Sequence, residues 1–313
     1  MKKIQVQAPG LFTTVQDLGR EGFGPMGVSP SGAADPISLR LGNRLVRNAE
    51  DAAALEMTLL GGAFLFPEGA VVALTGSDFG ASLDGVPVGP WASVEARPGQ
   101  TLRLGPTRSG ARCYLCVQGG ISVKPFLGSA STHILSGLGG LDGRPLRKGD
   151  VLNMGPANSS FRKRTLAPQA LQSLSPRKVL RVTPGPQTDW FPESSRRLFY
   201  SVAYRVTEES NRMGLRLEGA PIPENSGGHM ISEGVSLGAI QIPHGGQPII
   251  LFVEQQTTGG YPKIANVISA DLSSVGQLRP RDEIRFEPVG WETARSLFQK
   301  QERLLALPEL ILE

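Results

Sequence analysis

The chain has 313 residues, of which 40% are hydrophobic, and a formal net charge of +4. This length suggests about two domains. Its 39 Gly and 25 Pro are scattered without a repeat, which favours many short strands joined by tight turns. A nucleic-acid surface would need a basic stripe with stacking aromatics, but aromatics are only 6%. No signal peptide follows the first lysines and no run approaches the ~18 apolar residues of a membrane helix, so we expect a cytoplasmic protein.

Cysteine and histidine spacing does not favour a metal site. Cys113 and Cys116 have redox-motif spacing, but residues three apart in a strand point to opposite faces and a second ligand pair is missing. We therefore expect two core thiols. His133, His229 and His244 lack the local spacings of a zinc site, so no metal is predicted.

The first half of the chain reads as strands around one helix. Residues 4–7 alternate as a strand would. Asp35 followed by Pro36 is typical of a helix start and predicts a helix over 36–47. Short apolar segments separated by Gly-containing and Pro-containing turns over 54–120 predict an antiparallel meander or barrel.

Three later segments stand apart from the strand-like pattern of the first half. The glycines of 137–143 lack both GxGxxG spacing and a Walker lysine, so we expect a surface loop. Residues 156–178 are rich in Ser, Pro, Gln and basic residues and read as a linker. Amphipathic spacing predicts a packed helix over 291–306, followed by a tail that is either docked or frayed.

The sequence repeats itself weakly in a constant order. Residues 4–14 are echoed by 180–189, 38–43 by 214–219, and 147–156 by 279–288. Two related barrel-like domains would explain this. The predicted order is a first domain at 1–155, a linker at 156–178, a second domain at 179–290, and a helix with its tail at 291–313.

One turn in the second half collects uncharged polar groups and glycines. Two apolar runs, 238–242 and 248–253, lead into it. Its side chains offer hydrogen-bond donors without charge, and its glycines would let backbone N–H groups approach a substrate oxygen. The predicted substrate-binding residues of this turn are Gln256, Thr257, Thr258, Gly259 and Gly260. The alternative is a purely structural hairpin. No GxSxG nucleophile motif is present, so serine hydrolysis is not supported.

Several strings together resemble one known family. They include FTTVQDLGREGFGPMGVSPSGAADP, VQGGISV, ISEGVSLGAIQIP and QTTGGYPKIA, and the likeness runs from about residue 3 to 289. The chain resembles the family that comprises the 5-oxoprolinase C component, KipA, and allophanate hydrolase subunit 2, which is the biotin-dependent carboxyltransferase domain of urea amidolyases. The resemblance implies a mainly β fold, with two cyclophilin-like β-barrel domains and few helices.

The same resemblance implies an activity shared with partners. Its leading implication is the C component of an ATP-dependent 5-oxoprolinase, which converts 5-oxo-L-proline to L-glutamate with a KipI-like B component and a LamB/YcsF-like A component. ATP with Mg would act at the level of the complex. One alternative is a biotin-dependent carboxyltransferase component of the urea carboxylase and allophanate pathway. Another is a KipA-like non-catalytic regulator that binds a KipI-like kinase inhibitor.

Three residues near the turn are candidate catalytic groups. Lys263 is a candidate for holding a carboxylate or phosphate, the alternative being a solvated strand lysine. Tyr261 would stack on a ring or donate its hydroxyl, or else anchor the core. Glu233 has apolar neighbours, so burial would raise its pKa towards that of a base. Its alternative is a paired structural carboxylate, with one of the nearby arginines as a possible partner.

Two further sets of residues are predicted to bind substrate. Arg212 and Arg216 would share a face in a helix or a strand and could bind a carboxylate. The amino-terminal turn gathers polar groups that either form a second site or pin the loop: Thr14, Gln16, Asp17 and Arg20. This turn, or a partner protein, is expected to complete the site.

Overall fold

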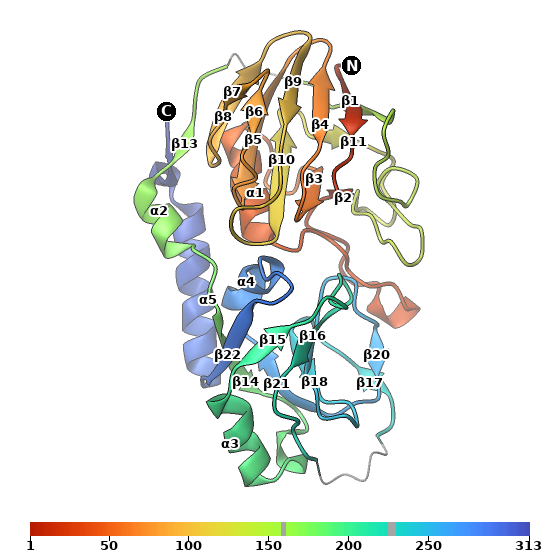
Figure 1. Cartoon of the computed structure of the whole chain (residues 1–313), viewed down its shortest axis with the longest axis vertical. Helices are drawn as coiled ribbons and strands as arrows, with labels where there is room; N and C mark the ends of the chain where they lie inside the picture. The colour runs from red at the N-terminus through yellow and green to blue at the C-terminus, as the bar shows by residue number, and fades with distance from the viewer. Residues whose placement is uncertain (158–160, 225–229) are drawn as a thin grey trace. The chain divides into compact units, whose positions relative to one another are not determined.

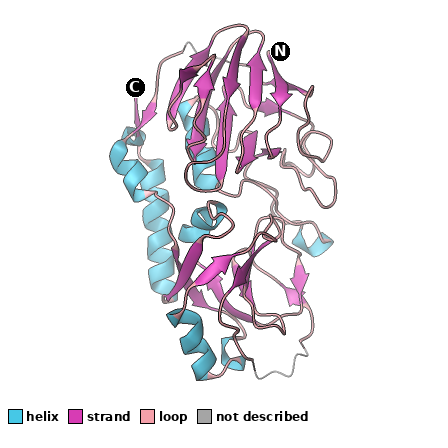
Figure 2. Cartoon of the chain, in the orientation of Figure 1, coloured by secondary structure: helices cyan, strands magenta, loops and turns pink. Residues whose placement is uncertain are grey.

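The computed structural model describes residues 1–157, 161–224 and 230–313, which form two compact units. His229 lies outside the described residues. The first unit comprises Met1–Arg20, Ser31–Ser175 and Leu307–Glu313, and the second comprises Glu21–Pro30 and Pro176–Ala306. Strands make up most of the regular structure and helices are few (Figure 2), so the predicted mainly β fold is confirmed.

Two seven-stranded sheets enclose the core of the first unit. The first sheet has the order β11 (Ile121–Ser122), β12 (Val151–Met154), β1 (Lys3–Ala8), β4 (Ala63–Phe66), β9 (Gln100–Arg103), β6 (Ser82–Leu83), β7 (Val86–Pro87). The second has the order β2 (Phe12–Gln16), β3 (Ala54–Thr58), β10 (Arg112–Val117), β5 (Ala70–Gly76), β8 (Ala92–Ala96), β13 (Thr165–Leu166), β23 (Ile311–Leu312). Alternation along each strand turns apolar side chains inward, so Ile4 and Phe64 of one sheet share a buried cluster with Leu55 of the other.

Helix α1 (Pro36–Leu45) lies beside β5 and β10 (Figure 1). Asp35 caps it, because its Oδ1 accepts a hydrogen bond of 3.1 Å from the backbone N–H of Ser38. Ile37, Leu41 and Leu45 are buried on one face. The helix predicted from the Asp-Pro pair is confirmed, and it ends two residues earlier than expected.

The two cysteines lie on opposite faces of β10, as strand geometry requires. Cys113 belongs to the core between the sheets. Cys116 faces α1, where a Cβ on Gly42 would lie 2.6 Å from its Sγ. Both thiols are free and buried, and burial raises the pKa of each. The prediction of two core thiols is confirmed.

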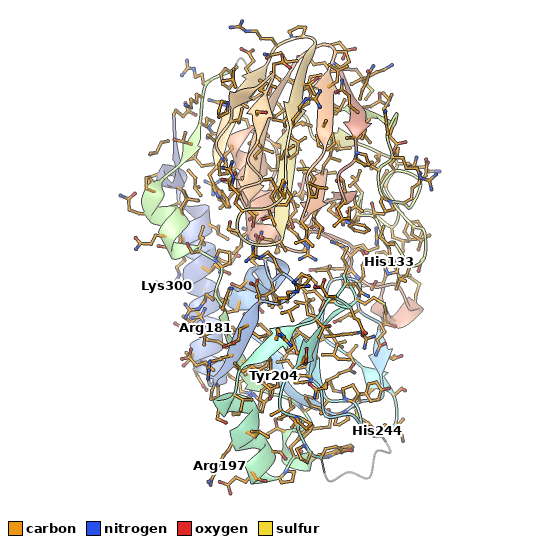
Figure 3. All side chains as sticks on the ribbon, in the orientation of Figure 1. His133, Arg181, Arg197, Tyr204, His244 and Lys300 are labelled. Atoms are coloured by element: carbon orange, nitrogen blue, oxygen red, sulfur yellow. The ribbon has the colours of Figure 1, made fainter. Side chains whose placement is uncertain are left out.

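The second unit contains a closed seven-stranded barrel. Its order is β14 (Val179–Pro184), β21 (Lys263–Val267), β18 (Ala239–Gln241), β19 (Ile249–Leu251), β16 (Gly214–Glu218), β15 (Tyr204–Val206), β22 (Glu283–Pro288). Parallel pairing of β14 with β22 closes it. Tyr204, labelled in Figure 3, packs with Phe286, which stacks on Phe199 of α3 (Glu193–Ser201) at 4.6 Å between ring centroids. A separate ribbon pairs β17 (Glu233–Gly234) with β20 (Thr258–Gly259).

The last predicted helix is α5 (Trp291–Ala306), whose bounds agree with the prediction. The tail is docked, because β23 pairs with β13 and Ile311 is buried. The segment expected to be a linker carries β13 and α2 (Pro168–Ser173). The remaining helical elements are α4 (Leu272–Gly276), η1 (Gly24–Met26), η2 (Thr188–Trp190), η3 (Ser269–Asp271) and η4 (Pro308–Leu310). No helix in the described part of the chain is long and apolar enough to cross a membrane.

Close backbone packing explains the glycine-rich stretch 137–143, which forms a loop as predicted. Gly139 has φ +65°, and a Cβ there would lie 2.1 Å from Ser131 O. A Cβ on Gly143 would lie 1.9 Å from the carbonyl oxygen of Gly137. These glycines therefore let the chain fold tightly on itself.

Candidate functional site

The uncharged turn, residues 256–260, forms a glycine-containing rim on the second unit. Register pairs Gly259 with Glu233 in the β17–β20 ribbon, and Lys263 with Gln241 across β18 and β21. Side chains opposite one another in an antiparallel pair lie on the same face. The fold thus brings two predicted catalytic residues, Glu233 and Lys263, to the rim.

Lys263 and Glu233 form an ion pair of unequal exposure. Lys263 Nζ lies 2.6 Å from Glu233 Oε1, and the two side chains are 3% and 45% exposed. The hydrogen bonds from Lys263 and then from Gln187 lower the pKa of Glu233. The predicted rise in the pKa of Glu233 is wrong, because the carboxylate is half exposed and stands beside a cation. Lys263 is likewise not a solvated strand lysine.

Gln187 holds this ion pair in place. It follows β14, and its Nε2 donates to Glu233 Oε1 at 2.9 Å while its Oε1 accepts the Lys263 backbone N–H at 3.1 Å. Sequence reasoning did not select Gln187. The available signal was its place in the segment 180–189, which echoes residues 4–14.

Gln241 is a second residue that sequence reasoning missed. Its side chain is 2% exposed, and its buried Nε2 has no hydrogen-bond partner among the residues that the structure describes. A Cβ on Gly259 would lie 2.5 Å from this Nε2 and 2.9 Å from that of Gln256, so a side chain at 259 would displace these two amides. The available signal was one polar residue within the apolar run 238–242.

The outer part of the rim is open to solvent. Gln256 and Thr258 are exposed, whereas Thr257 and Gly260 are half-buried. Tyr261 is 39% exposed, and its ring stands edge-on to His244, labelled in Figure 3, at 6.1 Å between centroids. The Tyr261 ring is therefore not a core anchor.

Arg212 and Arg216 do not share a face, so the prediction that both arginines point the same way is wrong. Arg212 is 6% exposed and pairs with Glu254, which is 2% exposed. Arg216 lies on β16, is 53% exposed, and stands 3.9 Å from Glu209. The reason is that Arg212 precedes the strand in a turn shaped by Asn211, whose Oδ1 accepts the Met213 N–H, so strand alternation does not extend to it.

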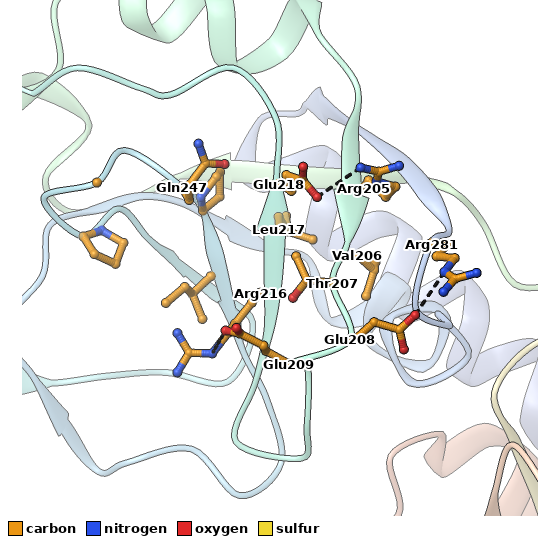
Figure 4. A pocket seen from close by; sticks show the side chains of 14 residues that line it. Arg205, Val206, Thr207, Glu208, Glu209, Arg216, Leu217, Glu218, Gln247 and Arg281 are labelled. Atoms are coloured by element: carbon orange, nitrogen blue, oxygen red, sulfur yellow. Dashed lines mark hydrogen bonds and ion pairs between the residues drawn. The ribbon is translucent and has the colours of Figure 1, made fainter.

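Arg216 instead lines a groove of about 710 Å³ on the second unit (Figure 4). Two other exposed ion pairs flank this groove, Arg205 with Glu218 at 3.1 Å and Arg281 with Glu208 at 3.0 Å. Each arginine in the groove faces a glutamate, so the charges largely cancel. None of the described rim residues lines this groove.

In the first unit, the polar residues of the amino-terminal turn bond to the loop at 126–132. Asp17 accepts hydrogen bonds of 2.6 Å from both Ser129 Oγ and Ala130 N. The Arg20 guanidinium lies 5.6 Å over the Phe126 ring. Gln16 Nε2 donates to Thr14 Oγ1 at 3.0 Å and to the carbonyl of residue 132 at 3.2 Å. These contacts fit the structural alternative, in which the turn pins a loop.

Among the described residues, no group of three or more His, Cys, Asp or Glu side chains is placed to hold a metal ion.

Comparisons with known proteins agree on one family. Residues 26–288 match the family described as carboxyltransferase domain, subdomain A and B. The chain is 38% identical to the C component of 5-oxoprolinase from Escherichia coli over 300 residues, or 96% of each protein. It is also 38% identical to urea amidolyase of Saccharomyces cerevisiae, covering 96% of this chain but 17% of that protein.

A solved structure extends this likeness to the fold. The crystal structure of the K. lactis urea amidolyase superposes with a TM-score of 0.91 at 34% identity, covering 97% of this chain and 20% of that one. The chain is therefore a homologue of the 5-oxoprolinase C component and belongs to the carboxyltransferase domain family, subdomains A and B.

Proposed function

We propose that this chain is the C component of an ATP-dependent 5-oxoprolinase and acts with the A and B components. The observation that carries the proposal is the match to the Escherichia coli C component, which spans 96% of both proteins. The urea amidolyases are matched over about a fifth of their length or less. A C component acts within a complex, so its two partner proteins are part of the proposal.

The proposed reaction opens the ring of 5-oxo-L-proline. One lactam, one ATP and two waters give L-glutamate, ADP and phosphate, so that the C–N bond of the ring is cleaved. A lactam carbonyl is resonance-stabilised and needs activation together with a base for the attacking water. The rim supports a binding role, because Gln256, Thr257 and Thr258 offer uncharged hydrogen-bond donors around a small planar amide.

Lys263 and Tyr261 are the proposed further contacts. A buried ammonium favours a negatively charged or strongly polar substrate oxygen. Tyr261 is exposed enough to stack on the ring or to donate its hydroxyl. We assign ATP and its magnesium to the assembled complex, because the glycines of 137–143 pack against their own chain.

A biotin-dependent carboxyltransferase role is the second candidate. The TM-score of 0.91 to the K. lactis urea amidolyase supports it. Both reactions act on a small planar amide, so one rim could serve either. The two candidates separate by substrate: a carboxyltransferase component would process carboxybiotin with urea and would not couple 5-oxoproline to ATP hydrolysis.

Reconstitution tests the leading proposal. Purified A and B components are mixed with this chain, and ATP hydrolysis and glutamate release are measured with and without 5-oxoproline. We expect stimulation by 5-oxoproline, strong loss with Lys263→Ala, and partial loss with Gln256→Ala. Lys300→Ala on exposed α5 is the matched control, and its activity should equal that of the wild type. A complex that hydrolyses no additional ATP when 5-oxoproline is added would contradict the proposal.

A further inference from the structure

In the ion pair at the rim, Lys263 is buried and fixed in the barrel, whereas Glu233 is half exposed and can be displaced from Lys263. Lys263 is 3% exposed and begins β21, which is paired on both sides, with β14 and with β18. An ammonium in such a position needs a counter-charge, since an unpaired buried charge is strongly destabilising. Lys263 therefore requires an anionic partner, but that partner does not have to be Glu233.

Displacing the Glu233 carboxylate from Lys263 costs little free energy. Its side chain is 45% exposed, and β17 is attached to β20 through only two residue pairs. Among the residues that the structure describes, its carboxylate is held, besides the ion pair with Lys263, by one hydrogen bond from Gln187. Turning outward would return this carboxylate to water, where it is well solvated.

Gln241 supplies an additional hydrogen-bond donor on the strand beside Lys263. Gln241 lies opposite Lys263 in the ladder, and its buried Nε2 approaches Gly259, the register partner of Glu233. In the described part of the chain this Nε2 has no hydrogen-bond partner. An unmade hydrogen bond of this kind is costly, so it indicates a group whose partner arrives from outside.

We propose that Lys263 and Gln241 form a binding site for the carboxylate of a small substrate, and that Glu233 occupies this site until the substrate displaces it. The inference rests on the proposed function, in which 5-oxoproline supplies the carboxylate. The incoming group takes over the ion pair with Lys263 Nζ and adds the hydrogen bond from Gln241 Nε2. Glu233 is then a competitor for the site and not the base. Urea, which has no carboxylate, would gain nothing from this pair of donors.

The decisive variant is Glu233→Gln, which removes the competing charge. Binding of 5-oxoproline is measured by calorimetry on the full chain without ATP, so that the result does not depend on turnover. Glu233→Gln leaves the buried Lys263 ammonium without its carboxylate partner, and the incoming carboxylate restores that pairing, so we expect affinity to rise at least about fivefold. Lys263→Met should abolish binding, and Gln241→Met should weaken it about tenfold while leaving the thermal midpoint unchanged or higher. The neutral lactam 2-pyrrolidinone should bind wild type and Glu233→Gln equally.

Glu218→Gln is the matched control, since it removes an exposed, paired carboxylate from the same unit. It should leave the affinity for 5-oxoproline unchanged. Equal affinities of wild type and Glu233→Gln would overturn the inference, as would absence of binding to the wild-type chain. In the reconstituted complex, Glu233→Gln should lower KM; a lower kcat at unchanged KM would show that Glu233 acts in the chemistry instead. If the wild-type complex shows no 5-oxoproline-dependent ATP hydrolysis, the proposed function is contradicted, whereas the binding measurements still test the carboxylate site.

Discussion

Arg212 and Arg216 allow a matched comparison of a buried and an exposed ion pair. Replacing Arg212 by Met would leave Glu254, which is 2% exposed, as a buried charge without its arginine partner. Such losses cost about 3–5 kcal/mol, a large share of the ~5–15 kcal/mol that stabilises a typical domain. Arg216→Met removes an exposed arginine 3.9 Å from Glu209 and should cost about 0–1 kcal/mol.

The measurement is equilibrium urea unfolding of both single variants and of the double variant Arg212→Met with Glu254→Gln. The double variant should recover a substantial part of the lost free energy of unfolding, because the buried charge that lost its arginine is also removed. If Arg212→Met costs no more than Arg216→Met, the buried pair does not stabilise the second unit as argued. A double variant no more stable than Arg212→Met would refute the reasoning about uncompensated charge.

Two further predictions concern the first unit. Gly139→Ala should lower the thermal midpoint by several degrees, because residue 139 has φ +65° and a Cβ would meet a carbonyl oxygen at 2.1 Å; an unchanged midpoint would contradict the close packing of this loop. Asp150 has a pKa below its usual value, chiefly through its hydrogen bond with Arg144, so its stabilisation is present above the unfolded-state value of about 4 and is lost as pH falls through the lower folded value. Asp150→Asn should therefore flatten the fall in the free energy of unfolding below about pH 4, as measured by urea titrations across pH; an unaltered slope would argue against this contribution.

Two of the helices, α1 and α5, could be predicted because their signals are local. The Asp35-Pro36 pair fixes the start of α1, and amphipathic spacing alone marks α5. The closed barrel had no such signal, since β14 pairs with β22 across about a hundred residues of intervening chain. A mainly β class follows from turn composition, and the internal echo pointed to two barrel-like domains, but strand order depends on pairings between distant segments that the sequence does not show.

The candidate site was predicted in outline and wrong in its electrostatics. The rim at 256–260 was selected because two apolar runs lead into a turn of uncharged polar residues and glycines. The pKa of Glu233 was predicted in the wrong direction because its neighbours in sequence are apolar, whereas its neighbours in space include Lys263. Gln187 and Gln241 were missed for the same reason, since each contributes through a contact made across the fold.

Segment exchange between the units constrains how the protein can be made and divided. Residues 21–30 belong to the second unit, while the last seven residues belong to the first and supply β23, an edge strand of its second sheet. During synthesis, β13 can pair with β8 at once, but its other partner, β23, arrives only after the second unit has been translated. A cut between residues 175 and 176 would therefore yield two incomplete folding units. Expressing each unit separately would require joining residues 21–30 to the second unit and residues 307–313 to the first.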